Sequence, residues 1–311
     1  MLEELLKESG MVLAECAVAE RLRRMPGVEL HPTLFNAPLI YGPESSRRAM
    51  AGIYREYLEI ARAAGRPMLL TAPTWRLDAE RLAAAGMPPS MVVDAVAFLR
   101  ALRDEAASDQ PPVMVGGLVG PRSDCYRPDL APGAAEAERF HEWQVGQLVD
   151  GGAEFLLAQT MPSVAEAAGI ARLISATGKP FIISFCAGPD GCVLDGTPLP
   201  EAMAWIDATV PAGARPVGYF VNCTHPCFLL SAYREGELDR LIGIQANGSS
   251  RDVRQLDGSA ATMADPVASW TESMAEVRRR FGVAVLGGCC GTGAEHLAAL
   301  AALPSQTMSR P

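Results

Sequence analysis

The sequence predicts a (β/α)₈ barrel, and two features that repeat along its 311 residues support this fold. Eight short runs of apolar or β-branched residues indicate buried strands, and segments with helical periodicity separate most of them. A strand followed by a helix, repeated within about 300 residues, is typical of this barrel. The length is compatible with one domain over residues 1–311. A doubly wound open sheet is the alternative, although no Gly-x-Gly-x-x-Gly motif follows an early strand.

The expected strands are apolar throughout, which indicates that both of their faces are buried. This is typical of a parallel sheet covered by helices. They are residues 11–13, 67–71, 113–116, 155–158, 181–184, 217–221, 241–244 and 283–286. The expected helices are residues 46–64, 90–107, 135–150, 163–177, 198–210 and 266–281. Two stretches containing proline and glycine, residues 31–43 and 120–133, are expected to be long loops that shape a substrate pocket.

Several residues mark the ends of these helices. Ser163 with Glu166, and Thr292 with Glu295, match the capping-box pattern that opens a helix. Gly178 and Gly282 follow the last periodic residues of two helices, where glycine commonly ends a helix. The second capping box predicts a further helix that begins near Thr292.

Composition and charge exclude several classes of protein. The chain is 49% hydrophobic and 20% charged, and it contains no apolar run of about 18 residues that would suggest a membrane span. Residues 1–7 carry acidic residues where a secretory signal would be positive, so a cytoplasmic location is expected. A net charge of −9 argues against binding to nucleic acid, which requires phosphate neutralisation. Small-molecule substrates are therefore expected, and a homo-oligomer is compatible with the sequence.

Eight cysteines lie at positions 16, 125, 186, 192, 223, 227, 289 and 290. In a reducing cytoplasm they need not form disulfides, and a bond between the adjacent Cys289 and Cys290 would close a strained ring. Buried cysteines are also common as core residues. A vicinal pair within a glycine-rich loop, together with a third cysteine after another strand, favours metal binding or catalysis.

Three of these cysteines follow strands that a barrel would place near one another. Cys223 follows the sixth expected strand, and Cys289 and Cys290 follow the eighth, so their loops are expected to meet on one face. Three protein ligands leave the fourth position of a tetrahedral zinc ion open, as in catalytic zinc sites. Zinc favours the thiolate form of a bound thiol, which suits alkyl transfer to sulfur. The helix expected near Thr292 would add its positive N-terminal end.

The cysteine motifs resemble those of the homocysteine S-methyltransferase family. The resemblance rests on residues 287–292, followed by Glu295-His296-Leu297, and on Asn222-Cys223-Thr224. Residues 159–162, 184–186 and 195–198 extend it through the middle of the chain. It implies a zinc-bearing barrel with Cys223, Cys289 and Cys290 as ligands. It further implies methyl transfer to a zinc-activated thiol, with homocysteine as the expected acceptor and methionine as the product, and no protein nucleophile.

The methyl donor is expected to be a free small sulfonium or quaternary ammonium compound. The chain shows no added cobalamin- or folate-binding domain. Trp75, near the expected rim, is a candidate donor contact through cation–π attraction, and a hydrophobic plug is the alternative role for this side chain.

The chain departs from the family at two places that concern the acceptor. Residues 15–20, Glu-Cys-Ala-Val-Ala-Glu, replace the family's Asp-Gly-x-x-Gly-Thr, and Gln159 replaces a glutamate. Without the two glycines, the backbone of residues 15–20 cannot approach a ligand as closely. The amide of Gln159 also lacks the negative charge of a glutamate. The residues expected to contact the acceptor are Glu15, Cys16, Gln159, Thr160 and Asn222. A different thiol or selenol acceptor, or a catalytically degenerate zinc-binding barrel, are the alternatives.

Overall fold

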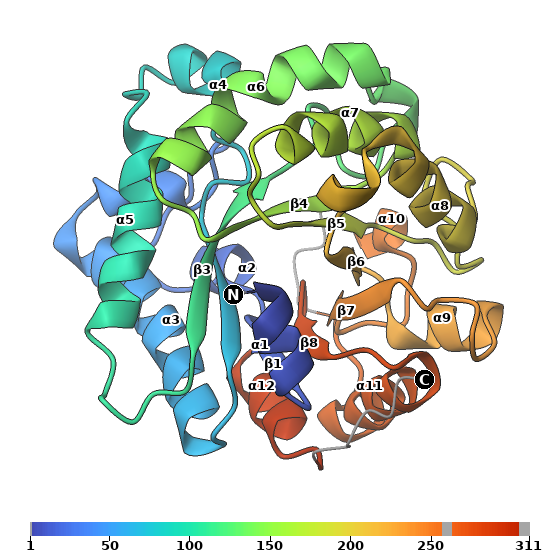
Figure 1. The fold of residues 1–311 in the computed structure, drawn as a ribbon. Helices are drawn as coiled ribbons and strands as arrows, with labels where there is room; N and C mark the ends of the chain where they lie inside the picture. Colours follow the sequence, from blue (N-terminus) through green and yellow to red (C-terminus); the bar gives the residue numbers. More distant parts are fainter. Residues whose placement is uncertain (1, 257–262, 305–311) are drawn as a thin grey trace.

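The computed structural model describes residues 2–256 and 263–304, and its eight parallel strands form a closed barrel (Figure 1). The strands are β1 (Val12–Ala14), β2 (Met68–Ala72), β3 (Val113–Val119), β4 (Phe155–Met161), β5 (Phe181–Phe185), β6 (Gly218–Asn222), β7 (Leu241–Ala246) and β8 (Val285–Gly288). Each pairs in parallel with its neighbours in sequence, and β8 pairs with β1. The predicted barrel is confirmed, and all eight expected strands are present.

Helices cover the outside of the barrel. They are α1 (Leu2–Glu8), α2 (Ala19–Arg23), α3 (Glu44–Ala63), α4 (Ala79–Ala84), α5 (Met91–Asp104), α6 (Ala134–Asp150), α7 (Val164–Ser175), α8 (Leu199–Thr209), α9 (Pro226–Ala232), α10 (Val253–Leu256), α11 (Val267–Phe281) and α12 (Ala294–Ala301), with 3₁₀ turns at Ala37–Ile40, Pro128–Leu130 and Ala212–Ala214. The six long predicted helices are confirmed. The short α1, α2, α4, α9 and α10 were not predicted, because so few residues give little periodicity. Within the described ranges, no helix combines the length and apolar character needed to cross a membrane.

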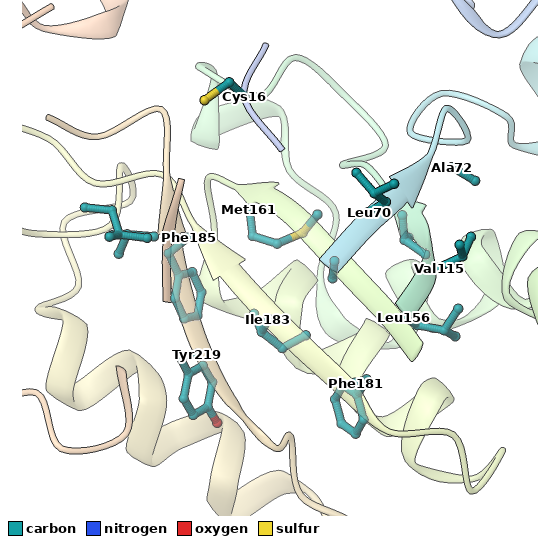
Figure 2. Close-up of a cluster of buried hydrophobic side chains, with 14 of the residues drawn as sticks. Cys16, Leu70, Ala72, Val115, Leu156, Met161, Phe181, Ile183, Phe185 and Tyr219 are labelled. Atoms are coloured by element: carbon teal, nitrogen blue, oxygen red, sulfur yellow. The ribbon is translucent and has the colours of Figure 1, made fainter. Parts of the chain in front are cut away.

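The core has two layers that follow from the alternation of side chains along each strand. Inward-pointing residues of the strands, such as Phe155, Phe220 and Ile242, fill the barrel, and Leu2 of α1 packs with them. Outward-pointing residues pack against the helices, as Figure 2 shows for Phe181, Ile183 and Phe185 of β5. Because the interior is filled by side chains, only the strand ends and their loops are free to build a site. We call the carboxyl-terminal end the barrel mouth.

The capping box expected at Ser163 is wrong, although Ser163 does stand at the N-cap of α7. Its side chain makes no capping hydrogen bond. The Glu166 carboxylate instead accepts the Arg122 backbone N–H at 2.6 Å and lies 3.2 Å from His141 Nε2. The Glu166 carboxylate therefore binds Arg122 of the β3–α6 loop in place of the Ser163 backbone that the capping-box pattern predicts.

The capping box expected at Thr292 is also wrong. The Thr292 hydroxyl donates to the Cys289 carbonyl at 2.6 Å, and α12 begins two residues later, after Gly293. The Gly293 N–H donates to His296 Nδ1 at 3.3 Å.

The glycines predicted to follow the ends of two helices are confirmed. Gly282 has φ 64° and Gly178 has φ 72°, the left-handed conformation in which glycine commonly ends a helix.

Two glycine substitutions test the packing of the barrel interior. A Cβ on Gly243 would overlap the Phe220 ring, whereas a Cβ on the exposed Gly52 of α3 meets no atom within 4 Å. We expect Gly243→Ala to lower the free energy of unfolding by about 1–3 kcal/mol through overpacking. Gly52→Ala should raise it by about 0.5–1 kcal/mol through helix propensity. Urea denaturation measures both changes, and equal stability of the two variants would contradict this account of the core.

Candidate metal centre at the barrel mouth

Three cysteine sulfurs converge where β6 and β8 end. Cys223 follows β6 directly, Cys289 and Cys290 follow β8, and only β7 lies between these strands. The three Sγ atoms lie within 4.8 Å of one another, and those of Cys223 and Cys289 are 2.7 Å apart. Cys223 is buried, Cys289 half-buried and Cys290 exposed. The sulfurs therefore form a compact set that opens toward solvent on one side.

The chemistry of this set suits a soft divalent cation. Ligand sulfurs about 2.3 Å from a tetrahedral zinc ion lie about 3.8 Å apart, which falls between the 2.7 Å contact and the 4.8 Å span seen here. The hydrogen-bonding contact with Cys223 raises the pKa of Cys289 well above its ordinary value, and burial raises it further. Because neighbouring thiols oppose each other's ionisation, a bound cation is what would let them become thiolates together. The residues present fit a metal.

Asn222 connects the cysteines to two other strands. Its Oδ1 accepts the Thr160 N–H at 2.9 Å and the Ser184 hydroxyl at 2.6 Å. Its Nδ2 donates to the Thr160 hydroxyl at 2.7 Å and lies 3.5 Å from Cys223 Sγ and 4.0 Å from Cys289 Sγ. The side chain is fully buried. It therefore directs an N–H group at two ligand sulfurs while its oxygen is fixed by β4 and β5.

The backbone is strained on both sides of this amide. Thr160 has φ 63° and Cys223 has φ 51°, which is uncommon for residues other than glycine. Such conformations cost of order 1–3 kcal/mol each and gather at functional sites, where surrounding contacts hold them. Here Asn222 supplies those contacts for Thr160 from both atoms of its amide.

Two glutamine side chains span the mouth beside the cysteines. Gln159 Nε2 donates to Gln245 Oε1 at 2.7 Å, and Gln245 Nε2 donates to the Glu15 carbonyl at 3.3 Å. The Gln159 Oε1 atom makes no hydrogen bond within the described residues, so it is available to a ligand. Gln245 was not predicted. The sequence did contain a sign of its role, because Gln245 is the polar residue in an otherwise apolar strand.

Glu15 and Cys16 are both buried after β1. The Glu15 carboxylate accepts hydrogen bonds from the backbone N–H and the hydroxyl of Thr71, and burial raises its pKa to about 7. Cys16 belongs to the buried hydrophobic cluster at 2% exposure, and burial raises the pKa of its thiol to about 12. Its sulfur is outside the three-cysteine set. Of the two, only the carboxyl group changes charge near neutral pH.

Trp75 lies at the mouth, in the loop that follows β2. Its Nε1 donates to the Gln159 carbonyl at 3.0 Å. The Phe35 ring stacks on it with centroids 5.7 Å apart, and the guanidinium of Arg76 lies 4.4 Å from its centroid. Phe35 and Arg76 were not predicted at the site. The indole thus already has a cation as a neighbour.

Tyr126, in the β3–α6 loop, was also not predicted at the site. It packs against Cys223 in a small cluster with Cys186 and Val253. The nearby Cys223 sulfur and burial raise the pKa of its phenol well above the ordinary value. The loop that contains Tyr126 therefore reaches the cluster that contains Cys223.

The fold and the site define a (β/α)₈ barrel with three clustered cysteines at its mouth that could hold a metal ion. The family model described as homocysteine S-methyltransferase matches residues 11–303. The chain therefore belongs to the homocysteine S-methyltransferase family, whose members transfer methyl groups to a thiol acceptor.

Curated relatives and solved structures agree with this assignment. The chain is 24% identical to homocysteine S-methyltransferase YbgG of Bacillus subtilis, over 97% of this chain and 96% of the relative. It is 25% identical to homocysteine S-methyltransferase of Escherichia coli, over 97% of each. The metallated form of the homocysteine methyltransferase MmuM from Escherichia coli has a similar fold, with a TM-score of 0.73, 22% identity and coverage of 97% of this chain and 99% of that one.

Asn222→Ala tests the contact between the amide and the ligand sulfurs. Groups that orient metal ligands typically change metal affinity about 10- to 100-fold, so we expect zinc affinity to fall by about that factor. Competition with a chromophoric chelator measures it. Ser184→Ala is the control, because this hydroxyl bonds the same Asn222 oxygen without approaching the sulfurs. Equal losses in both variants would contradict a direct role for the Asn222 N–H.

Glu15→Gln tests the buried carboxyl group through the pH dependence of folding. A pKa raised from 4.5 to about 7 contributes stability below pH 4.5 that is lost as the pH rises through 7. The free energy of unfolding of the metal-free wild type should therefore fall, relative to that of Glu15→Gln, by about 3 kcal/mol between pH 4.5 and pH 8. Urea denaturation across this range measures the difference. Parallel pH profiles would show that Glu15 ionises normally.

Proposed function

We propose that the protein transfers a methyl group from a small sulfonium or quaternary ammonium donor to the thiol of homocysteine, giving methionine, with zinc held by Cys223, Cys289 and Cys290. The observation that carries the proposal is the compact, open set of three sulfurs within 4.8 Å in a chain of this family. When bound, zinc would supply the positive charge that favours the thiolate form of the acceptor. That a similar homocysteine methyltransferase was solved in a metallated form supports metal binding by this protein.

Residues at the carboxyl ends of β1 and β4 would hold the acceptor. The free Gln159 Oε1 can accept a hydrogen bond from an ammonium group, and Glu15 can offer a carboxylate. An ammonium beside Glu15 would favour its charged form and lower its raised pKa. Asn222 and Thr160 would fix the surrounding backbone, as their mutual hydrogen bonds do here.

The reaction needs no nucleophile from the protein. The acceptor sulfur forms a bond to the methyl carbon while the electrons of the old carbon–sulfur or carbon–nitrogen bond return to the donor, which leaves as a neutral thioether or amine. The role of the chain is to place the two molecules in line and to exclude water. Trp75 at the mouth is the proposed wall of the donor site.

A reducing compartment suits this site, because its sulfurs must stay unoxidised to bind a metal. All eight cysteines are free in the structure. We therefore propose that the enzyme works in the cytoplasm.

Cys290→Ala tests the proposed function. We expect it to lose bound zinc and to lower methyl transfer by at least about 100-fold, because two sulfurs cannot hold an open three-ligand site. Metal analysis and mass spectrometry of products from a matrix of thiols and onium donors measure the two effects. Cys192→Ala is the control, since this half-buried thiol lies outside the sulfur set.

Three outcomes would contradict the proposal. They are purified wild-type protein without zinc, a Cys290→Ala variant with full zinc content and turnover, and a zinc-loaded wild type that methylates no thiol in the matrix. The last result would identify a zinc-binding barrel without this activity.

A further inference from the structure

The three cysteines of the proposed metal centre are held in place by different contacts. Cys223 is buried, and its sulfur lies 3.5 Å from Nδ2 of the buried Asn222 amide. The Cys289 N–H donates to the Ala246 carbonyl of β7 at 2.7 Å, which continues the pairing of β7 with β8. Cys290 is the exposed member of the set, so packing does not fix its side chain. Its position depends on the backbone that follows it.

The peptide group between Cys290 and Gly291 is hydrogen-bonded at both ends. Its carbonyl oxygen accepts the Gly248 N–H, in the loop after β7, at 2.8 Å. Its N–H donates to the carboxylate of Glu20 in α2. A trans peptide group is planar, and its N–H and carbonyl point in opposite directions, so these two bonds fix the orientation of the plane. The Cα atom of Cys290 lies in that plane and is fixed with it.

The two hydrogen bonds come from different kinds of neighbour. On the β7 side, a Cβ on Gly248 would lie 2.6 Å from the Gly291 carbonyl oxygen, so main chain packs directly on main chain. Gly291 has φ 78°, in the left-handed region that favours glycine. On the α2 side, a side chain alone provides the bond, and that side chain is Glu20. This second contact can therefore be removed without changing the backbone.

Glu20 is itself oriented by Arg24, which follows α2. Arg24 Nη2 donates to Glu20 Oε1 at 2.8 Å, while Glu20 Oε2 accepts the Gly291 N–H. The side chain of Glu20 is 18% exposed, and the arginine balances its charge. The carboxylate thus reaches the cysteine loop as an oriented hydrogen-bond acceptor that carries its own counter-ion.

We propose that Glu20 is a positioning residue for the metal: by holding the Gly291 N–H, it keeps the Cys290 thiol close to the other two sulfurs. This inference rests on the proposed zinc site. Groups that orient metal ligands typically change metal affinity about 10- to 100-fold, and the least buried ligand has the most freedom to lose. Glu20 ends the segment of residues 15–20 that was expected to contact the acceptor, so this segment would serve the metal centre as well.

Three substitutions of Glu20 separate its reach from its charge. Glu20→Ala removes the acceptor of the Gly291 N–H, and we expect it to lower zinc affinity by about 10- to 100-fold. Glu20→Gln should lower it by less than about fivefold, because the amide oxygen still accepts this N–H although a neutral acceptor is weaker. Glu20→Asp keeps the charge on a side chain one methylene shorter, and it should lose more affinity than Glu20→Gln. Competition with a chromophoric chelator measures all three, and urea denaturation of the metal-free variants shows that they are folded.

Glu295→Ala is the matched control. Glu295 lines the same cavity as Glu20, beside Gly291 and Arg24, but within residues 2–256 and 263–304 it accepts no hydrogen bond from the cysteine loop. Its removal should leave zinc affinity at the wild-type value. A Glu20→Ala variant with wild-type affinity would overturn the inference. A Glu20→Asp variant that binds zinc more tightly than Glu20→Gln would also overturn it, and this comparison decides the matter if Glu20→Ala does not fold. Wild-type protein that binds no zinc would instead contradict the proposed function.

Discussion

The pairing of β8 with β1 is the constraint on which the site depends. In this register Val12 faces Val285 and Leu13 faces Leu286, and the sheet closes. Closure brings the segment after β1 against the cysteine loop, where the Gly288 N–H donates to the Glu15 carbonyl at 3.2 Å. The segment after β1 and the cysteine loop, which are far apart in sequence, thereby lie side by side at the barrel mouth. Without closure the chain would still have strands and cysteines, but they would not share a mouth.

The Asn222 amide connects the end of β6 to β4 and β5 beside the three cysteines. It fixes Thr160, one of two strained residues at the strand ends, and it directs an N–H group toward the sulfur of the other, Cys223. A buried amide is stable only where its hydrogen-bonding capacity is used, and here each end has at least two partners. The hydrogen bonds of Asn222 therefore hold the strained backbone of Thr160 in place beside the sulfurs.

The sequence was sufficient to predict the barrel and the convergence of the three cysteines, because both leave local signals. Strands buried on two faces appear as apolar runs, and the adjacent cysteines stand next to such a run. The failures were of another kind. Glu166 satisfies a local capping pattern, but its carboxylate is bound by Arg122, 44 residues away. Gln245 bonds to Gln159, which is 86 residues away and is brought near by the fold of the barrel, and no spacing in the chain reveals that partner.

The neutral amide of Gln159 fits the change of charge in the proposed reaction. It lies at the end of β4 and is bonded to Gln245 of β7. An onium donor loses its positive charge as its methyl group leaves, so a glutamate at this place would attract the donor more strongly in the ground state than in the transition state. An interaction of that kind does not accelerate methyl transfer. The amide can still accept a hydrogen bond from the ammonium group of the acceptor, so it can position the acceptor without stabilising the donor before the reaction.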